Sequence, residues 1–471
     1  MRDRPLWQWS ACDLAETIAA GEISSRQAVA AAVDRMNDRN GALNAVVDAF
    51  GDEALAEAER LDETLQRSGP VGPLHGVPIT IKENIDQAGK ATPNGVAAIK
   101  DVIAPDDSPV VRNLTQAGAV VIGRTNTPEF SMRGTTDNPL HGRTFNPWND
   151  WASPGGSSGG ASSAVMSGMG ALAHGNDILG SLRFPATATG ATSVKPGLGR
   201  VPAYNPSAPG ERGLLAVLMS VQGVIAREVR DVRLAMRELI KYDPRDPWMV
   251  PVPLDGEALE GPIKVAFTKN TFEFPLHAAV ERALDTAAAA LSEAGYEIVE
   301  TEPPLVREIA AEACKCLFGE FHALLVKDVE KYGSKTFKEI FKNYYEYFGY
   351  YEPADLLRGL SRRTHYAREW TQFLHEYPLV LTPFLPQPTY KWDRDTEGRD
   401  GVIDVLGSSV YGYTMNFLGL PAGNVPADYN DGLPVGVQII GRRFREDLIL
   451  DACEAVEQRV GVMAEQLFKR G

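Results

Sequence analysis

The sequence predicts an α/β fold in which helices cover a largely buried sheet. Val77 to Lys82 and Ala119 to Gly123 are short β-branched runs bounded by glycine and proline, which indicates buried strands. Ser108 to Gly118, which lies between them, has the pattern of a helix. Because alternating strands and helices are typical of α/β proteins, these three segments determine the predicted class.

Residues 1–69 are predicted to form helices that precede the sheet. Apolar residues at helical spacing indicate a helix over residues 13–20, which a glycine ends. Ser24, with Gln27 three residues later, is a capping-box pattern and predicts the start of a second helix. Residues 54–65, rich in alanine and glutamate, indicate a third helix.

Residues 151–200 are crowded with glycine, serine and alanine. Such a composition is typical either of a flexible linker or of tight turns that bring backbone close to a reacting atom. Val165, Met166 and Met169 stand at helical spacing within residues 161–172, whereas a linker lacks apolar periodicity. The pattern therefore favours packed structure.

The second half of the chain continues the alternation. Residues 262–267 indicate a strand, and the alanine-rich residues 277–295 indicate a helix that ends at a glycine. Residues 305–377 are predicted to be mostly helical. Asn-Asp-Gly at 430–432 is a turn signal before a strand over residues 433–440.

Composition and charge argue against several classes of partner. The 471 residues carry a formal net charge of −15 and no basic run, which argues against nucleic-acid binding. No stretch of about 18 residues is uninterruptedly apolar, and the first residues lack the apolar run of a secretory signal. Four scattered cysteines do not suggest a disulfide framework. We therefore expect a cytoplasmic protein whose partner is a small molecule, not nucleic acid or a membrane.

Metal and cofactor sites are not predicted. The seven histidines never form HxH, HxxxH or HExxH, and Cys314 and Cys316 lack the usual zinc spacing. The chain has neither a GxxxxGK[ST] phosphate loop nor a dinucleotide-binding fingerprint after a strand. The expected chemistry therefore uses no metal ion and no cofactor.

Serine and lysine are the residues that stand out. Ser157 and Ser158 lie between glycine pairs, and Ser181 follows a predicted strand 24 residues after Ser157. Lys82 ends an apolar strand, where burial would disfavour its charge and lower its pKa. A neutral lysine can act as a general base, so a Ser–Lys hydrolase needs no histidine.

These segments together resemble the amidase signature family, which uses a Ser–cis-Ser–Lys triad. The matching motifs are Lys-Glu-Asn at 82–84, Pro-Gly-Gly-Ser-Ser-Gly-Gly at 154–160 and Gly-Asn-Asp-Ile-Leu-Gly-Ser-Leu-Arg-Phe-Pro-Ala at 175–186. The separations of 75 residues from Lys82 to Ser157 and 24 from Ser157 to Ser181 also match. The resemblance spans about residues 10–460 and implies an amide-bond hydrolase that works through an acyl-enzyme.

The resemblance implies a role for each member of the triad. Ser181 would be the nucleophile, Ser157 would pass its proton on after a cis peptide bond, and Lys82 would act as base and later as acid. Ser158 is nearly indistinguishable from Ser157 in composition, and only the spacing prefers Ser157. The oxyanion hole would consist of the backbone N–H groups of Ile178, Leu179, Gly180 and Ser181.

Four further residues and one segment are candidates for supporting roles. Met132 and Asn138 are predicted to line the substrate pocket. Asp177 and Arg183 are candidates for a buried ion pair that braces the nucleophile loop. The aromatic run at 341–351 either walls an apolar pocket or packs in the core.

Leu179 departs from the family pattern, because relatives usually have glycine there. A leucine keeps the N–H donor, but it does not easily adopt positive φ and its side chain needs space. Leu179 is either a natural adjustment of the pocket or an introduced substitution. We expect it to reshape the acyl or leaving-group pocket without removing activity. The lysine motif also has Glu83 where aspartate is commoner.

Three functions remain open within the resemblance. The first is hydrolysis of small aryl or alkyl amides, anilides, cyclic amides or carbamates. The second is the glutamine-hydrolysing subunit of a tRNA-dependent amidotransferase, and the third is a catalytically silent binding protein. Asn176 and Phe184 favour the first, because the amidotransferase subunit usually has Thr and Gln there. Asn176 and Leu182 resemble the branch of aryl acylamidases and 6-aminohexanoate cyclic dimer hydrolases, and the filled triad disfavours the third.

The resemblance also implies an architecture. It predicts one large α/β/α domain over residues 1–471 with a mixed, mostly parallel sheet. Residues 1–69 would be N-terminal helices, 70–240 the signature core, and 305–400 a variable region that shapes substrate access. Homodimers are common in the family, so a second copy of the chain is the one protein partner that the resemblance suggests.

Overall fold

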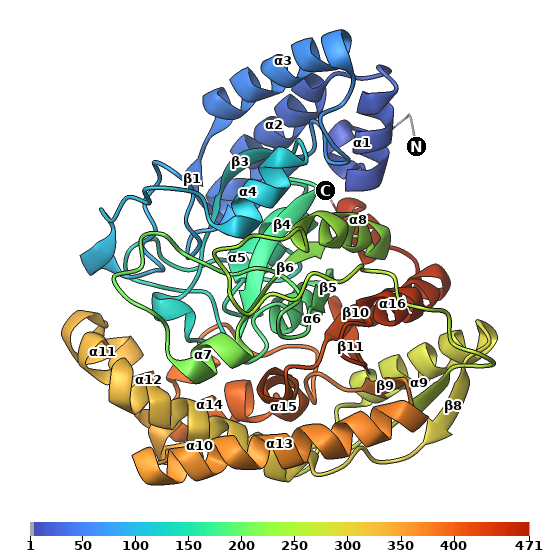
Figure 1. The fold of residues 1–471 in the computed structure, drawn as a ribbon. Helices are drawn as coiled ribbons and strands as arrows, with labels where there is room; N and C mark the ends of the chain where they lie inside the picture. Colours follow the sequence, from blue (N-terminus) through green and yellow to red (C-terminus); the bar gives the residue numbers. More distant parts are fainter. Residues whose placement is uncertain (1–3, 471) are drawn as a thin grey trace.

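The computed structural model describes residues 4–470 and contains an eleven-stranded sheet (Figure 1). The strand order is β1-β3-β2-β4-β6-β5-β10-β11-β9-β7-β8. The strands are β1 (Val46–Ala49), β2 (Pro78–Lys82), β3 (Val120–Thr125), β4 (Leu172–Asp177), β5 (Thr192–Lys195), β6 (Val221–Ala226), β7 (Lys264–Phe267), β8 (Glu297–Glu300), β9 (Leu379–Thr382), β10 (Ala422–Asn430) and β11 (Leu433–Gly441).

Seventeen α-helices surround the sheet within residues 4–470. They are α1 (Ala11–Ala19), α2 (Ser25–Leu43), α3 (Gly51–Ser68), α4 (Pro109–Gln116), α5 (Gly159–Met166), α6 (Arg183–Thr189), α7 (Leu214–Met219), α8 (Val229–Leu239), α9 (Ala278–Glu293), α10 (Val306–Leu324), α11 (Val326–Tyr332), α12 (Lys335–Phe348), α13 (Pro353–Glu376), α14 (Gly398–Val402), α15 (Val410–Leu418), α16 (Glu446–Val460) and α17 (Met463–Phe468). The predicted α/β class is therefore confirmed.

The sheet is mixed, as predicted, but most of its strand pairs are antiparallel. Within residues 4–470, β2–β3, β2–β4, β7–β8 and β7–β9 are parallel, and the other six pairs are antiparallel. The expectation of mostly parallel pairing is therefore wrong. Part of the reason is local: the short turn at 431–432 joins β10 and β11 as a hairpin, and a hairpin pairs its strands antiparallel.

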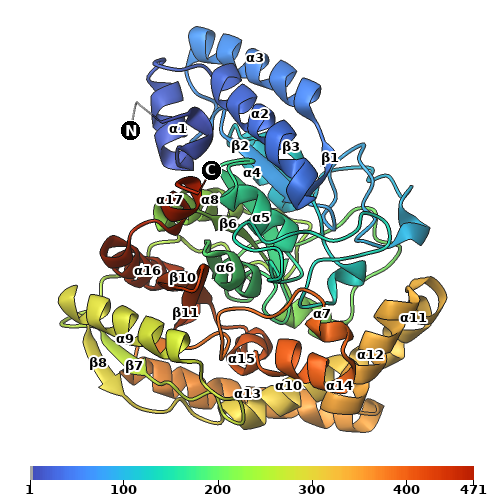
Figure 2. The same ribbon diagram turned by 180° about the vertical axis from the view of Figure 1, so that it is seen from behind.

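Helices cover both faces of the sheet. Apolar side chains of α1, α4, α8, α9 and α16 form a large core on one face. Helices α5 and α6 pack against the other face, where Figure 2 shows them in front of the sheet, and α17 closes the core around them. Helices α10 to α13 lie together at one end of the molecule, far from the N-terminal helices (Figures 1 and 2).

The predicted start of the second helix is confirmed in detail. The hydroxyl of Ser24 accepts from the backbone N–H of Gln27 at 3.0 Å. The Gln27 side chain accepts in return from the N–H of Ser24 at 2.8 Å. This reciprocal pair satisfies N–H groups that the first turn of α2 leaves without helical partners.

Residues 161–172 are packed structure, as predicted, but the helix is shorter than the pattern suggested. Helix α5 ends at Met166. Gly168 and Gly170 then adopt positive φ of 83° and 102°, which turns the chain into β4 at Leu172. The glycines thus convert a helical apolar pattern into a helix, a turn and a strand.

The aromatic run at 341–351 lies mainly on α12 and packs in a second core with α10, α13 and α15. Phe318 of α10 stacks on Phe348, with ring centroids 5.4 Å apart. Tyr344 is buried, and its hydroxyl donates to the backbone carbonyl of Met132 at 3.2 Å. Core packing, one of the two predicted interpretations, is therefore observed, and the same helix supports the loop that carries Met132.

Three structural features are absent from residues 4–470. The four cysteines form no disulfide bond with one another. No helix in this part of the chain is both long and apolar enough to cross a membrane. The same residues contain no cluster of three His, Cys, Asp or Glu side chains placed to hold a metal ion.

Candidate active site

Three segments of the sheet and its loops bring the predicted triad to one region. Lys82 is the last residue of β2, and β2 lies between β3 and β4. Ser157 stands just before α5, and Ser181 lies in the turn between β4 and α6. Because β2 and β4 are parallel neighbours, their carboxyl ends lie at the same edge of the sheet, where α/β proteins place their ligands.

Glycines let the two serine loops approach each other. A Cβ atom on Gly175 of β4 would lie 2.9 Å from the Ser158 hydroxyl oxygen. A Cβ atom on Gly155, whose φ is 79°, would lie 2.7 Å from the Cα atom of Pro185. The glycine-rich composition that resembled a linker is therefore required for close backbone packing.

Lys82 is fully buried and is surrounded by three oxygen atoms. Its Nζ atom lies 2.7 Å from Ser157 Oγ, 3.0 Å from Ser158 Oγ and 2.8 Å from Asn176 Oδ1. Burial lowers the pKa of the Lys82 ammonium well below its usual value, although the negative charges of Asp177 and Glu83 act in the opposite direction. The predicted buried lysine with a lowered pKa is confirmed.

Ser157 and Ser158 both contact Lys82 but have different environments. The peptide bond between Gly156 and Ser157 is cis. The backbone carbonyl of Ser157 accepts from the Thr127 hydroxyl at 2.9 Å. The hydroxyl of Ser158 instead donates to the backbone carbonyl of Asn176 at 3.4 Å. The proton of Ser158 is thus directed away from Lys82.

Ser181 is the most accessible of the three predicted triad residues. It is 9% exposed, whereas Ser157 is 1% and Lys82 0% exposed. Its hydroxyl makes no hydrogen bond with any of residues 4–470. The structure therefore joins Lys82 to Ser157 but does not join Ser157 to Ser181. Catalytic hydrogen bonds are often long without substrate and tighten in the complex.

Backbone N–H groups without acceptors line the turn before Ser181. Those of Ile178, Leu179 and Ser181 make no hydrogen bond within the described chain, residues 4–470. The N–H of Gly180 donates to Asp177 Oδ1 at 2.8 Å. Three of the four predicted oxyanion donors are therefore unpaired, and the fourth is engaged by a carboxylate.

Leu179 fits this turn without the strain that its sequence position suggested. The positive φ of the turn, 121°, falls on Gly180 and not on Leu179. The half-buried Leu179 side chain packs against the second core, as do those of Phe130, Met132 and Ile178. Ile178 and Leu179, which belong to the turn itself, give it an apolar flank.

The predicted Asp177–Arg183 ion pair is confirmed. Arg183 Nε lies 3.0 Å from Asp177 Oδ2, and both side chains are 0% exposed. Burial by itself would raise the Asp177 pKa, but the charge and hydrogen bonds of Arg183 outweigh it and lower the pKa to about 2. Arg183 also donates to Asn416 Oδ1 at 2.6 Å and Gln438 Oε1 at 2.8 Å. The pair therefore ties the nucleophile turn to α15 and β11.

Met132 and Asn138, the two predicted pocket residues, have different environments. The Asn138 amide is buried and donates to Asn126 Oδ1 and to the carbonyl of Thr127 at 2.8 and 2.7 Å. Its oxygen accepts from two backbone N–H groups of the same loop. Asn138 thus holds its own loop together, whereas Met132 packs against the second core.

Sequence reasoning did not identify the asparagines beside the lysine. The amides of Asn84 and Asn176 pair with each other, with Asn176 Nδ2 donating to Asn84 Oδ1 at 3.0 Å. Asn84 Nδ2 donates to Ser131 Oγ at 2.9 Å. Both asparagines stand inside motifs that the sequence already singled out, so their position was a usable signal. No motif in the sequence pointed to Ser131.

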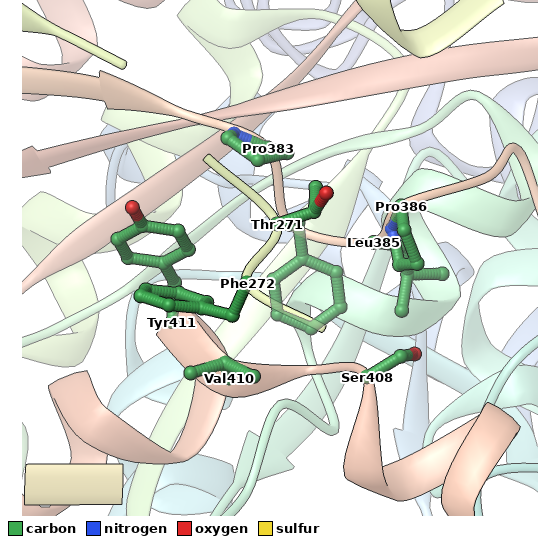
Figure 3. A pocket seen from close by; sticks show the side chains of 9 residues that line it. Thr271, Phe272, Pro383, Leu385, Pro386, Ser408, Val410 and Tyr411 are labelled. Carbon is green, nitrogen blue, oxygen red and sulfur yellow. The ribbon is translucent and has the colours of Figure 1, made fainter. Parts of the chain in front are cut away.

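Figure 3 shows the side chains that line a small cavity, one of whose walls, Phe384, also contacts the nucleophile turn. Its lining residues are Thr271, Phe272, Pro383, Phe384, Leu385, Pro386, Ser408, Val410 and Tyr411. Phe384 separates it from the turn, because a Cβ atom on Gly180 would lie 2.8 Å from the Phe384 ring. At about 10 Å³ the cavity has room for about one water molecule and not for an amide substrate.

Comparisons with known proteins identify the family to which the chain is similar. A family model described as Amidase matches residues 27–450. The indoleacetamide hydrolase of Bradyrhizobium diazoefficiens is 46% identical over 466 residues, which cover 99% of this chain and 89% of that protein. A glutamyl-tRNA(Gln) amidotransferase subunit from Moorella thermoacetica is 32% identical, covering 96% of this chain and 97% of that protein.

Solved structures of amide hydrolases also match this chain. A bacterial aryl acylamidase described as an amidase signature enzyme matches with a TM-score of 0.83 and 28% identity over 99% of each chain. A 6-aminohexanoate cyclic dimer hydrolase in complex with substrate matches with a TM-score of 0.84 and 26% identity, covering 97% of this chain and 98% of that one.

Proposed function

Because this chain belongs to the amidase signature family of amide hydrolases, we propose that it cleaves small amides with an aryl or other apolar acyl group. We propose further that Lys82, Ser157 and Ser181 carry out the reaction. The observation that supports this most strongly is the buried Lys82 amine, whose pKa is lowered by burial, at 2.7 Å from the Ser157 hydroxyl. A neutral amine in that position is a general base aimed at a hydroxyl.

The first half of the reaction forms an ester on Ser181. The Ser181 hydroxyl attacks the carbonyl carbon and gives its proton to Ser157, which passes its own proton to Lys82 Nζ. The tetrahedral intermediate then collapses as its C–N bond breaks. The leaving nitrogen takes a proton back along the same route, so an amine or ammonia leaves neutral and Lys82 is again a free base.

The second half releases the acid. A water molecule attacks the Ser181 ester, and its proton follows the route through Ser157 to Lys82. The oxygen of the new tetrahedral intermediate carries the negative charge until the ester bond breaks and Ser181 recovers its proton. The products are a carboxylic acid and the regenerated enzyme.

The unpaired N–H groups of Ile178, Leu179 and Ser181 stabilise the negative oxygen in both halves. They are free of acceptors within residues 4–470, so they can donate to an oxyanion without first breaking a protein hydrogen bond. The carboxylate of Asp177 holds the Gly180 N–H and thereby fixes the shape of the turn. Donors that are prearranged in this way are typically worth about 10²–10³ in rate each.

Two observations favour an aryl or apolar acyl group. The half-buried side chains of Ile178 and Leu179 give the turn an apolar flank, and both pack against the second core. The relative with 46% identity is named for hydrolysis of indoleacetamide, a primary amide of an aromatic acid. An arylacetamide such as indole-3-acetamide therefore combines the acyl group that the flank suits with ammonia as a small leaving group.

A substrate panel tests this proposal. We expect indole-3-acetamide to have the highest kcat/KM among indole-3-acetamide, 4-nitroacetanilide, a linear nylon oligomer, a 6-aminohexanoate cyclic dimer, a small carbamate and glutamine. Glutamine is included because the amidotransferase subunit is 32% identical, and it is assayed with and without candidate partner subunits. A preference for glutamine would contradict the proposed acyl group and favour the amidotransferase function.

Replacing Leu179 by glycine is expected to change substrate preference while activity persists. The glycine keeps the N–H donor but removes an apolar side chain beside the reacting carbonyl, so bulkier amides should gain relative to small ones. Loss of a packing contact of this size typically changes discrimination by about 10–200-fold. The measurement is kcat/KM over the same panel.

The matched control for this change is Leu179→Met, which keeps the volume and should keep the order of substrates. Equal relative kcat/KM values for Leu179→Gly and the parent would show that Leu179 does not shape the pocket.

A further inference from the structure

A chain of hydrogen bonds runs from Lys82 through two asparagines to Ser131. Lys82 Nζ lies 2.8 Å from Asn176 Oδ1, Asn176 Nδ2 donates to Asn84 Oδ1 at 3.0 Å, and Asn84 Nδ2 donates to Ser131 Oγ at 2.9 Å and to Asn176 Oδ1 at 3.3 Å. The Ser131 hydroxyl donates onward to Asn94 Oδ1 at 2.5 Å, so Ser131 accepts from Asn84. On its other side, Lys82 Nζ lies 2.7 Å from Ser157 Oγ.

The orientation of the Asn176 amide follows from this chain of hydrogen bonds. Its NH₂ group donates to Asn84 Oδ1, so its oxygen faces Lys82. The reversed amide would place NH₂ against the lysine donors and one carbonyl oxygen against another. Asn84 is held in turn, because its own NH₂ group donates to Ser131. Asn176 therefore presents an acceptor to Lys82.

Counting protons around Lys82 then fixes where its lone pair points. A neutral lysine amine has two N–H bonds and one lone pair. The Asn176 oxygen can only accept, so it takes one N–H. The Ser158 hydroxyl donates its own proton to the Asn176 backbone carbonyl. Its oxygen can therefore only accept from Lys82, and it accepts the second N–H of the amine. The lone pair of the Lys82 nitrogen is then free to accept only the hydroxyl proton of Ser157.

We propose that Asn176, oriented by Asn84, is a positioning residue that aims the Lys82 lone pair at Ser157. This proposal rests on the proposed function, in which Lys82 is the base. It also gives a reason for a neutral amide at this place. An amide oxygen orients the amine without a full charge, whereas a carboxylate would hold Lys82 in its protonated form, which is no base.

The test is Asn176→Asp, which keeps the shape and replaces the amide by a carboxylate. The new charge should raise the Lys82 pKa and move the acidic limb of the kcat/KM profile to higher pH by at least about one unit. At a fixed pH on this acidic limb, activity should fall at least about tenfold and recover in more alkaline buffer. The same limb should move in the rate at which a fluorophosphonate modifies Ser181, which does not require turnover.

Three controls make the result decisive. Asn176→Thr, which still offers an oxygen acceptor, should keep the parental limb. Asn84→Ala removes the group that orients the Asn176 amide, so this variant should have a lower kcat and an unchanged KM. If Asn176→Asp does not fold, Asn84→Ala is the test used in its place. Lys82→Ala should be inactive at every pH.

The outcomes separate the two proposals. A parental pH profile in Asn176→Asp, or a parental kcat in Asn84→Ala, would overturn the positioning role while leaving Lys82 as the base. A folded Asn176→Asp variant that does not recover in alkaline buffer would overturn it too, because its loss would not come from lysine protonation. Turnover by Lys82→Ala would overturn the proposed function itself.

Discussion

Replacing Lys82 by alanine is expected to lower kcat/KM for every amide substrate by at least about 10⁴-fold at neutral pH. The Lys82 amine is the only basic group that contacts Ser157 within residues 4–470, so no other side chain takes over. Ser181→Ala should be equally inactive, because it removes the attacking oxygen. The measurement is hydrolysis of the best panel substrate at neutral pH.

The pH dependence of the parent enzyme follows from the same lysine. Burial lowers the Lys82 pKa well below its usual value, so the amine becomes neutral at lower pH than an exposed lysine would. Activity should therefore rise with pH through this lowered pKa and then level off. An enzyme active only near the ordinary pKa of lysine would contradict a base of lowered pKa.

A matched pair of serine variants serves as the control for the triad. Ser157→Ala interrupts the proton route and should cost far more than Ser158→Ala, whose hydroxyl already donates to the Asn176 carbonyl. Equal losses in the two variants would contradict the assignment of Ser157. Retained turnover in Ser181→Ala would contradict the covalent mechanism.

Replacing Arg183 by methionine is expected to lower the free energy of unfolding by about 3–5 kcal/mol. Asp177 would remain buried without its charge partner, and Asn416 and Gln438 would each lose a donor. The measurement is denaturant unfolding at pH 7, followed by circular dichroism. Activity should fall as well, because Asp177 holds the N–H of Gly180 in the turn.

The effect should depend on pH in a defined direction. Arg183 lowers the Asp177 pKa to about 2, so the pair contributes its stability above the unfolded pKa of 3.8 and loses it as pH falls towards 2. In Arg183→Met, burial instead raises the Asp177 pKa, and a protonated Asp177 costs less to bury. The difference between variant and parent should therefore shrink as the pH is lowered.

An exposed ion pair is the matched control for this prediction. Arg307 and Glu273 lie 2.6 Å apart, but their side chains are 44% and 45% exposed. Arg307→Met should change the free energy of unfolding by only about 0–1 kcal/mol. If the effect of Arg183→Met were as small, the buried pair would not brace the turn.

Local sequence patterns predicted most elements of the fold, because their signals involve residues close in the chain. The capping box at Ser24 and Gln27 links residues three apart and was found as predicted. The order of the strands in the sheet could not be predicted in this way. β5 pairs with β10, whose residues are more than 200 positions away, and no local pattern specifies such a partner. The expectation of mostly parallel strands failed partly because such distant pairings have no local signal and partly because the turn at 431–432 makes β10 and β11 a hairpin.

The sequence alone determined which residues to consider for the site. Lys82 at a strand end and the serines between glycines are local signals of a base and of tight turns, and their burial agrees with that interpretation. The sequence did not show whether Leu179 could be accommodated in the turn, because the positive φ falls on its neighbour Gly180.

The spacing to Ser181 already favoured Ser157 over Ser158, but only the tertiary structure shows how their environments differ and reveals Asn176 as a partner of Lys82. The sequence offers two adjacent serines with nearly the same surroundings. They differ through the Asn176 carbonyl, which reaches Ser158 because the start of α5 packs against β4. Asn176 and Lys82 are 94 residues apart and meet because β4 lies beside β2 in the sheet. A local pattern specifies the side chain at each position, but the pairing of distant strands decides which side chains share a proton.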